Sequence, residues 1–370
     1  MTASLGFVAC GGSDDDPGGN NGGSSGSGGS GGSGGTAGTG GTGGGNSETN
    51  PTCGGETSCT LPPERDTTGT APSGGAKTFA MSKLFLGDTK RDGTASVTAW
   101  QDYGYNLDGI VSNRNGSNHC APQPGSNPAQ IKTDGPGGID NSFGANLLPI
   151  ILSLAADAGD RVNESIAEGD FTVMIHNDSL GTEANQTPIS GALYGGSKLG
   201  AVPRFDGTDV WPATYELLND GDITKPKVTF PTAYVTNGIW VSGSAATVSL
   251  SLSISGFTLD LAITNAIITA DISDPNNVKN GLIAGVLNTE ALIDALRNIA
   301  GSLDPSLCSG TTFEGIAQQI RGASDLMADG TNGDSSKACN GISIALGFEA
   351  KPVILGDAAA PAEPGEDQCE

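Results

Sequence analysis

The sequence predicts a mainly β fold, a single β-sandwich-like domain with about three packed α-helices, and an α+β arrangement is the alternative. Three observations lead to this prediction. Asp-Gly and Asn-Gly dipeptides, which favour tight turns because these residues tolerate positive φ, recur between Asp92 and Asn340. Alternation of apolar and polar residues, typical of strands, is strongest over residues 246–272. Three other segments carry apolar residues at helical spacing.

Composition divides the chain into four parts. Residues 11–75 are rich in Gly, Ser and Thr and poor in apolar side chains, so we expect them to form a disordered tether. A β-rich globular domain is expected over residues 76–357, followed by an acidic tail over residues 358–370. The fourth part, residues 1–10, is a short apolar segment that ends in Cys10.

The strand predictions within the globular domain rest on alternation. Over residues 246–254 apolar side chains alternate with serine or threonine, and over residues 257–272 the alternation resumes in the opposite phase. This pattern predicts strands with one buried and one solvent-facing side, separated by a bulge or turn at Gly256. Further strands are predicted at residues 78–86, 96–103, 171–176, 227–234 and 342–348.

Three amphipathic helices are predicted between the strands, with their apolar faces toward the core. The first has Pro149 in its first turn and Gly169 after its last residue, where these residues favour a helix start and stop. The third starts with a capping box from Thr311 to Glu314 and continues to Gly330. The predicted helices occupy residues 147–168, 290–300 and 311–330.

The charge of the chain excludes one class of partner. With 41 acidic and 17 basic residues the formal net charge is −24, which repels the phosphate backbone, so no nucleic-acid partner is expected. No run of 18 apolar residues occurs, so no membrane-spanning helix is expected either.

The first ten residues indicate where the protein resides. In Phe7-Val8-Ala9-Cys10 a small residue precedes a cysteine and apolar residues precede that. Together with the tether, this segment resembles the bacterial lipoprotein family, in particular lipoproteins of the myxobacterial type. The resemblance implies lipidation at Cys10, attachment to the membrane through that lipid, and an extracytoplasmic position on the outer membrane or cell surface. Because only nine residues and no basic segment precede Cys10, we expect residues 1–10 to be a truncated signal peptide.

Cysteine parity agrees with an extracytoplasmic position. The chain has seven cysteines, and setting Cys10 aside for the lipid leaves an even number, which is typical of disulfide-bonded proteins in oxidising compartments. The remaining six are expected to pair as Cys53 with Cys59 by proximity, Cys308 with Cys339 across a predicted helix, and Cys120 with Cys369 by elimination.

One cluster of residues is a candidate ligand site. Aromatic rings stack on sugars while amides and acids bind their hydroxyls, and this mixture is found at Trp100, Tyr103, Tyr105, Asn106 and Asp108. The alternative is that the aromatic side chains belong to the core. A glycan or another envelope polymer is the partner that the first interpretation implies.

No cofactor is expected apart from Ca²⁺, which carboxylate-rich turns bind. Asp329 and Asp334 are the candidate ligands, and residues 271–274 and 134–141 are further acidic turns. None of these segments has the full spacing of a calcium loop, so ordinary turns are the alternative.

The chain has few candidates for catalysis. A serine nucleophile at Ser343 requires a histidine, and the chain contains only His119 and His176. We favour structural roles for both histidines and a strand around Ser343. Residues 191–198, which miss the phosphate-binding loop pattern by one position, are predicted to form a turn between strands.

These observations lead to a ranking of functions. A cell-envelope or surface lipoprotein with a structural or adhesive, non-enzymatic role comes first. A carbohydrate-binding module is the second interpretation, and a secreted hydrolase is the third.

Overall fold

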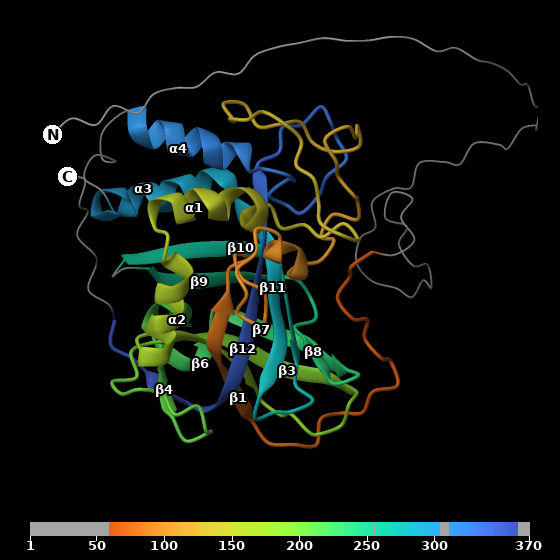
Figure 1. Ribbon diagram of the computed structural model, residues 1–370. Coiled ribbons are helices and arrows are strands. Elements are labelled where there is room, and N and C mark those ends of the chain that lie inside the picture. Colours follow the sequence, from red (N-terminus) through yellow and green to blue (C-terminus); the bar gives the residue numbers. More distant parts are fainter. Residues whose placement is uncertain (1–58, 255–256, 304–310, 362–370) are drawn as a thin grey trace, which may run out of the picture. The chain divides into compact units, whose positions relative to one another are not determined.

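Antiparallel strands dominate the structure, a computed structural model that describes residues 59–254, 257–303 and 311–361 (Figure 1). The mainly β class predicted from the sequence is confirmed. The strands are β1 (Lys77–Phe85), β2 (Thr172–Asn177), β3 (Gln186–Gly196), β4 (Val210–Ala213), β5 (Leu218–Asn219), β6 (Asp222–Pro226), β7 (Val228–Thr236), β8 (Ile239–Val241), β9 (Ala246–Ile254), β10 (Phe257–Asp271), β11 (Val278–Asn288) and β12 (Gly341–Ala358).

The main sheet closes on itself. Antiparallel pairings run from β1 through β2, β3, β7, β8, β10, β11 and β12, and β12 pairs again with β1. Opposite walls of this closed sheet therefore face each other across one core, whereas in a sandwich two separate sheets would do so. β9 pairs with β10, and β4 adds a parallel neighbour to the end of β12.

The core inside the closed sheet follows from alternation along each strand. On β12 the side chains of Ile344, Leu346 and Phe348 are fully buried in it, together with residues from every strand of the ring. The intervening residues Ser343 and Ala345 face the outer side and are also buried. Both faces of β12 are thus covered, which requires a second layer outside the sheet at this place.

Four α-helices are described: α1 (Leu148–Leu154), α2 (Ala158–Glu168), α3 (Thr289–Leu303) and α4 (Thr311–Gly322). α1, α3 and α4 lie at one end of the closed sheet, where β11 ends and β12 begins, whereas α2 packs along β1 (Figure 1). None of the described helices combines the length and the apolar content needed to cross a bilayer.

The first predicted helix is interrupted. A π-helical turn (Phe143–Leu147) precedes α1, and the chain leaves helical geometry at Ala155 before α2 begins. Gly169 ends α2 in the left-handed conformation at a φ of 79°, as its position in the sequence predicts. The third predicted helix ends early, because residues 325–326 turn to pair with Gly341.

The strongest strand prediction is confirmed. β9 and β10 pair as an antiparallel hairpin in which Ile254 lies opposite Phe257. Val248 and Leu261 are buried in the core, as the alternation requires. Gly256 itself lies outside the described residues.

Two local predictions are wrong. The strand expected at residues 96–103 is a short 3₁₀ helix (Ala99–Asp102), because the Ser96 carbonyl and hydroxyl bind the next backbone N–H groups and favour a turn. The turn expected at residues 191–198 is mostly the second half of β3, where Gly191 and Gly196 pair with β2.

Candidate functional site

A loop layer covers the outer face of the sheet where β11 ends and β12 begins. It consists of residues 103–142 and 323–340, which lie side by side near the helices (Figure 1). Tyr105 and Ala345 belong to the small apolar cluster beneath it. This layer contains four aspartates and a lysine whose pKa values are shifted by burial.

A disulfide fastens the two parts of the loop layer. Cys120 and Cys339 are 0% and 2% exposed, and their bond joins positions 219 residues apart. The pairings of Cys339 with Cys308 and of Cys120 with Cys369 are therefore wrong. The position of Cys339 near a predicted helix did not identify its partner, because Cys120 lies in a loop that is distant in the sequence and adjacent only in the folded chain.

The structure does not test the predicted pairing of Cys53 with Cys59. Cys59 is disulfide-bonded. Its expected partner Cys53, like Cys10, Cys308 and Cys369, lies outside the described residues.

Four aspartates form the polar centre of the loop layer: Asp108, Asp134, Asp140 and Asp325, which we call the aspartate cluster. Asp140 is 2% exposed, and the other three are partly buried. Each member is close enough to the other three for their charges to repel. Three separate segments of the chain contribute to it, which explains why no local motif marks it.

The first two carboxylates are held by turns of the loop layer. Asp108 accepts a hydrogen bond from the Ile110 N–H at 2.8 Å and one from the Asn332 amide at 2.7 Å. Asp134 accepts the Ser112 N–H at 2.5 Å. The Asn332 contact ties the two parts of the layer beside the disulfide.

Of the other two carboxylates, Asp140 binds within the layer and Asp325 connects the layer to the sheet. Asp140 accepts the Leu107 N–H at 2.6 Å. Asp325 accepts both the N–H of Ser343, at 2.8 Å, and its hydroxyl, at 2.5 Å, so it binds the start of β12 through two bonds. Ser343 in turn accepts the Ser142 N–H at 2.8 Å. The start of β12 and both parts of the loop layer are therefore joined by one carboxylate and one hydroxyl.

Burial and repulsion change the acidity of the cluster. Loss of hydration, followed by repulsion from Asp325 and Asp108, raises the pKa of Asp134 to about 8. Loss of hydration raises the pKa of Asp325 to about 7, although its bonds to Ser343 act in the opposite direction. The pKa values of Asp140 and Asp108 are also raised, chiefly by burial. The cluster therefore retains protons at neutral pH.

One cation accompanies the cluster. Lys132 is only 6% exposed, and burial, followed by repulsion from Arg114, lowers the pKa of its ammonium. The charge of Asp325 acts in the opposite direction, because it attracts the ammonium. The site thus contains proton donors and acceptors beside a buried ammonium that Asp325 attracts.

The geometry does not gather ligands for a metal ion. In residues 59–254, 257–303 and 311–361, no group of three or more acidic, histidine or cysteine side chains has the arrangement that a metal requires. Asp329 binds the N–H and hydroxyl of Thr331, and Asp334 binds those of Ser336 in the same way. These two candidate Ca²⁺ ligands therefore form ordinary aspartate turns, the alternative given by the sequence.

The candidate sugar-binding aromatics lie inside the structure. Tyr103 is fully buried and donates a hydrogen bond to the Thr89 carbonyl, while Tyr105 is 7% exposed and shares one with Thr269. The core alternative is confirmed for both tyrosines. Their rings offer no exposed face on which a sugar can stack.

The other members of that candidate site also have structural partners. Trp100 is partly buried and packs closely on Gly144, where an added Cβ atom would lie 2.6 Å from the Cβ of Trp100. The amide of Asn106 binds Ile110 and Gly109 within its own loop. Asp108 belongs to the aspartate cluster. The sequence analysis therefore singled out Asn106 and Asp108, which do lie in the loop layer, but it assigned them to sugar binding.

The serine and histidine considered for catalysis lie far apart. Ser343 is near the start of β12, whereas His176 pairs with Thr78, whose partner on β12 is Val353. Ten residues of extended strand separate Ser343 from Val353, which corresponds to roughly 30 Å. The structure does not bring these side chains together, and the strand predicted around Ser343 is confirmed.

His119 has a structural environment. It is 6% exposed, its Nε2 lies 2.6 Å from the Gly116 carbonyl, and its Nδ1 lies 3.3 Å from the Cys120 carbonyl. Both ring nitrogens are therefore engaged by the backbone of its own loop.

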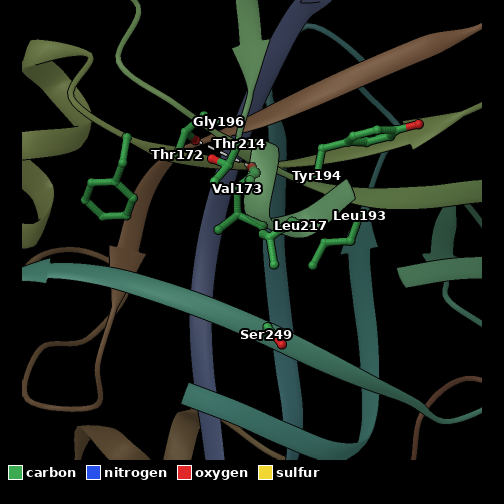
Figure 2. Close-up of a pocket in the computed structure, with 10 residues that line it drawn as sticks. Thr172, Val173, Leu193, Tyr194, Gly196, Thr214, Leu217 and Ser249 are labelled. Atoms are coloured by element: carbon green, nitrogen blue, oxygen red, sulfur yellow. Dashed lines mark hydrogen bonds between the residues drawn. The ribbon is translucent and has the colours of Figure 1, made fainter. Parts of the chain in front are cut away.

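A small cavity lies elsewhere, between β2, β3 and β9. Figure 2 shows its wall, which includes Val173, Leu193 and Ser249, and its volume is about 50 Å³. A space of this size accommodates water molecules and is well below the several hundred Å³ typical of ligand pockets. It is a packing defect beside the core.

Sequence reasoning missed three residues of the network. Asp325 follows a helix in an unremarkable segment, and Asn332 and Lys132 lie in loops. The local signals were Asp108, which was assigned to a sugar site, and the acidic turn at residues 134–141, which contributes Asp134 and Asp140.

Comparison of the chain with family models, curated proteins and solved structures gives no match. The function is therefore inferred from the residues and the structure of this chain.

Proposed function

We propose that the protein is a lipid-anchored, extracytoplasmic domain of the cell envelope or cell surface, with a structural or adhesive role and no catalytic activity. The observation that carries this proposal is the buried disulfide between Cys120 and Cys339. Such a bond persists in oxidising compartments outside the cytoplasm. The lipid at Cys10 is the anchor that the resemblance to lipoproteins implies.

The polar network supports a structural role for the loop layer. Asp325 and Ser343 use their side chains on each other and on the backbone of β12, and Asn332 binds Asp108 and accepts the Cys120 N–H. Side chains committed in this way hold loops in place. A rigid loop layer at one end of a closed sheet is suited to presenting a fixed surface to other envelope components.

The anchor is tested by metabolic labelling. An alkyne-bearing fatty acid is supplied to a bacterial host that produces the chain with the basic and apolar parts of a lipoprotein signal peptide added before residue 1, and the incorporated label is measured. We expect labelling that Cys10→Ser abolishes and that Ser13→Ala, a nearby control, leaves unchanged. An unlabelled wild-type protein, or a labelled Cys10→Ser variant, contradicts the proposal.

The absence of catalysis is tested separately with a fluorophosphonate probe, which labels activated serines. We expect no labelling at Ser343, because its hydroxyl is fully buried and bound to Asp325. Labelling that Ser343→Ala removes would support the hydrolase interpretation instead.

A further inference from the structure

The end of the closed sheet opposite the loop layer is hollowed by two adjoining cavities. Their volumes are about 470 Å³ and about 260 Å³, and both are lined by Lys77 and Pro275. The first strand begins here and the β10–β11 loop crosses here, far from α1, α3 and α4 (Figure 1). The larger volume falls within the range of small-molecule sites, which often occupy the mouth of a closed sheet.

Lys77 places a positive charge on the wall of both cavities. Its side chain is partly buried on the wall shared by the two cavities. In the described part of the chain no ion pair joins Lys77 to a carboxylate, which is also true of Lys90 and Lys279, but Lys77 lines both cavities. In a chain with 41 acidic residues, an ammonium left without such a partner at a cavity favours a bound anion.

The rest of the larger cavity combines polar and apolar surface. His176 is fixed by Thr78, whose hydroxyl lies 2.8 Å from Nδ1, and burial lowers the pKa of His176 despite the nearby Asp178. The imidazole is therefore a neutral hydrogen-bonding group at neutral pH. Pro352 and Ile354 supply apolar wall, and Ile354 is 48% exposed.

Acidic neighbours limit the charge of the ligand. Glu183 lines the smaller cavity, and its pKa is lowered by its backbone and Ser73 hydrogen bonds, so it is ionised. Asp178 lies 3.6 Å from His176, which lines the larger cavity. A doubly charged phosphate meets repulsion from both carboxylates, whereas one carboxylate on Lys77 does not require a second positive charge.

We propose that this end of the protein binds an organic monocarboxylate with an apolar body. Its carboxylate binds the Lys77 ammonium, and its apolar part fills the larger cavity against Pro275, Pro352 and Ile354. This assignment is independent of lipid anchoring and of the loop layer, so either proposal can fail without the other.

The test is calorimetric titration of the full chain at pH 7 with octanoate, octanol and octyl phosphate. We expect saturable binding of octanoate and weaker binding of the other two. Lys77→Gln should weaken octanoate binding about tenfold or more, the size of one charge-assisted hydrogen bond. Lys77→Arg, which keeps the charge, should stay within a few-fold of wild type, and its retained binding shows that the region is folded.

Lys198→Gln is the matched control, because it removes a lysine charge that is 73% exposed and paired with Asp170. Its octanoate affinity should equal that of the wild type. Three results overturn the proposal: no saturable octanoate binding, equal affinity for octanol, or wild-type affinity in Lys77→Gln. Tighter binding of octyl phosphate would overturn the preference for a monocarboxylate.

Discussion

Stability should fall as pH rises from 5 to 8, because the aspartate cluster must give up protons in the folded state. Burial and repulsion raise the pKa of Asp134 from 3.8 to about 8. A group whose folded pKa is raised binds its proton more tightly in the folded state than in the unfolded state. Its stabilising effect is complete below about pH 4 and is lost as pH approaches 8.

The perturbation that isolates this effect is Asp134→Asn, which removes the charge and keeps an oxygen to accept the Ser112 N–H. The full shift in pKa corresponds to about 5–6 kcal/mol. Because Asp134 is only partly buried, water reduces this value, and penalties measured for buried polar groups are about 1–3 kcal/mol. We expect Asp134→Asn to stabilise the protein by about 2 kcal/mol at pH 8 and by progressively less at lower pH, reaching about zero below pH 4, where the unfolded state also holds the proton.

Urea unfolding at pH 5, 6, 7 and 8 measures this difference. Asp334→Asn is the control, since this exposed turn aspartate has a lowered pKa, set by its hydrogen bonds to Ser336, and does not titrate in this range. Its unfolding free energy should follow the wild type at every pH. Wild-type stability that is flat or rises from pH 5 to pH 8, with no gain in Asp134→Asn, would refute the reasoning.

Three further variants are measured by urea unfolding at pH 6. Replacing both cysteines, Cys120→Ala with Cys339→Ala, opens a loop of 219 residues and should cost about 5 kcal/mol, and a cost below about 1 kcal/mol would contradict a native cross-link. Tyr105→Phe removes the bond to Thr269 at 2.8 Å and should cost about 1–2 kcal/mol, whereas a neutral result would show that water replaces it. Phe348→Ala empties a fully buried position and should cost about 3–5 kcal/mol, which a surface-like effect would disprove.

The sequence identified strands where one face is buried and the other is wet. β9 and β10 were predicted because their alternation survives in the sequence. β11 was missed, since Gly281 and Gly285 interrupt its pattern. These glycines leave room for neighbours: a Cβ at Gly281 would lie 2.4 Å from the Phe348 ring, and one at Gly285 would lie 2.6 Å from Ile263. Close packing between strands requires glycine at these positions, so the alternating side chains that would mark a strand are absent there.

The candidate site was predicted only in fragments for a related reason. Asp108 and the acidic turn at residues 134–141 were recognised locally, but Asp325 joins them through the pairing of Leu326 with Gly341. Such long-range contacts depend on the closed sheet and the disulfide, neither of which leaves a local pattern. Tyr103 and Tyr105 illustrate the converse, because a ligand-like composition also suits the core.

The most direct test of an extracytoplasmic, disulfide-stabilised domain is peptide mapping of the protein from its producing cells. Free thiols are alkylated before lysis and the protein is digested without reductant. We predict one cross-linked species that joins the Cys120 and Cys339 peptides, with neither cysteine alkylated. Recovery of both peptides separately and alkylated would contradict this account.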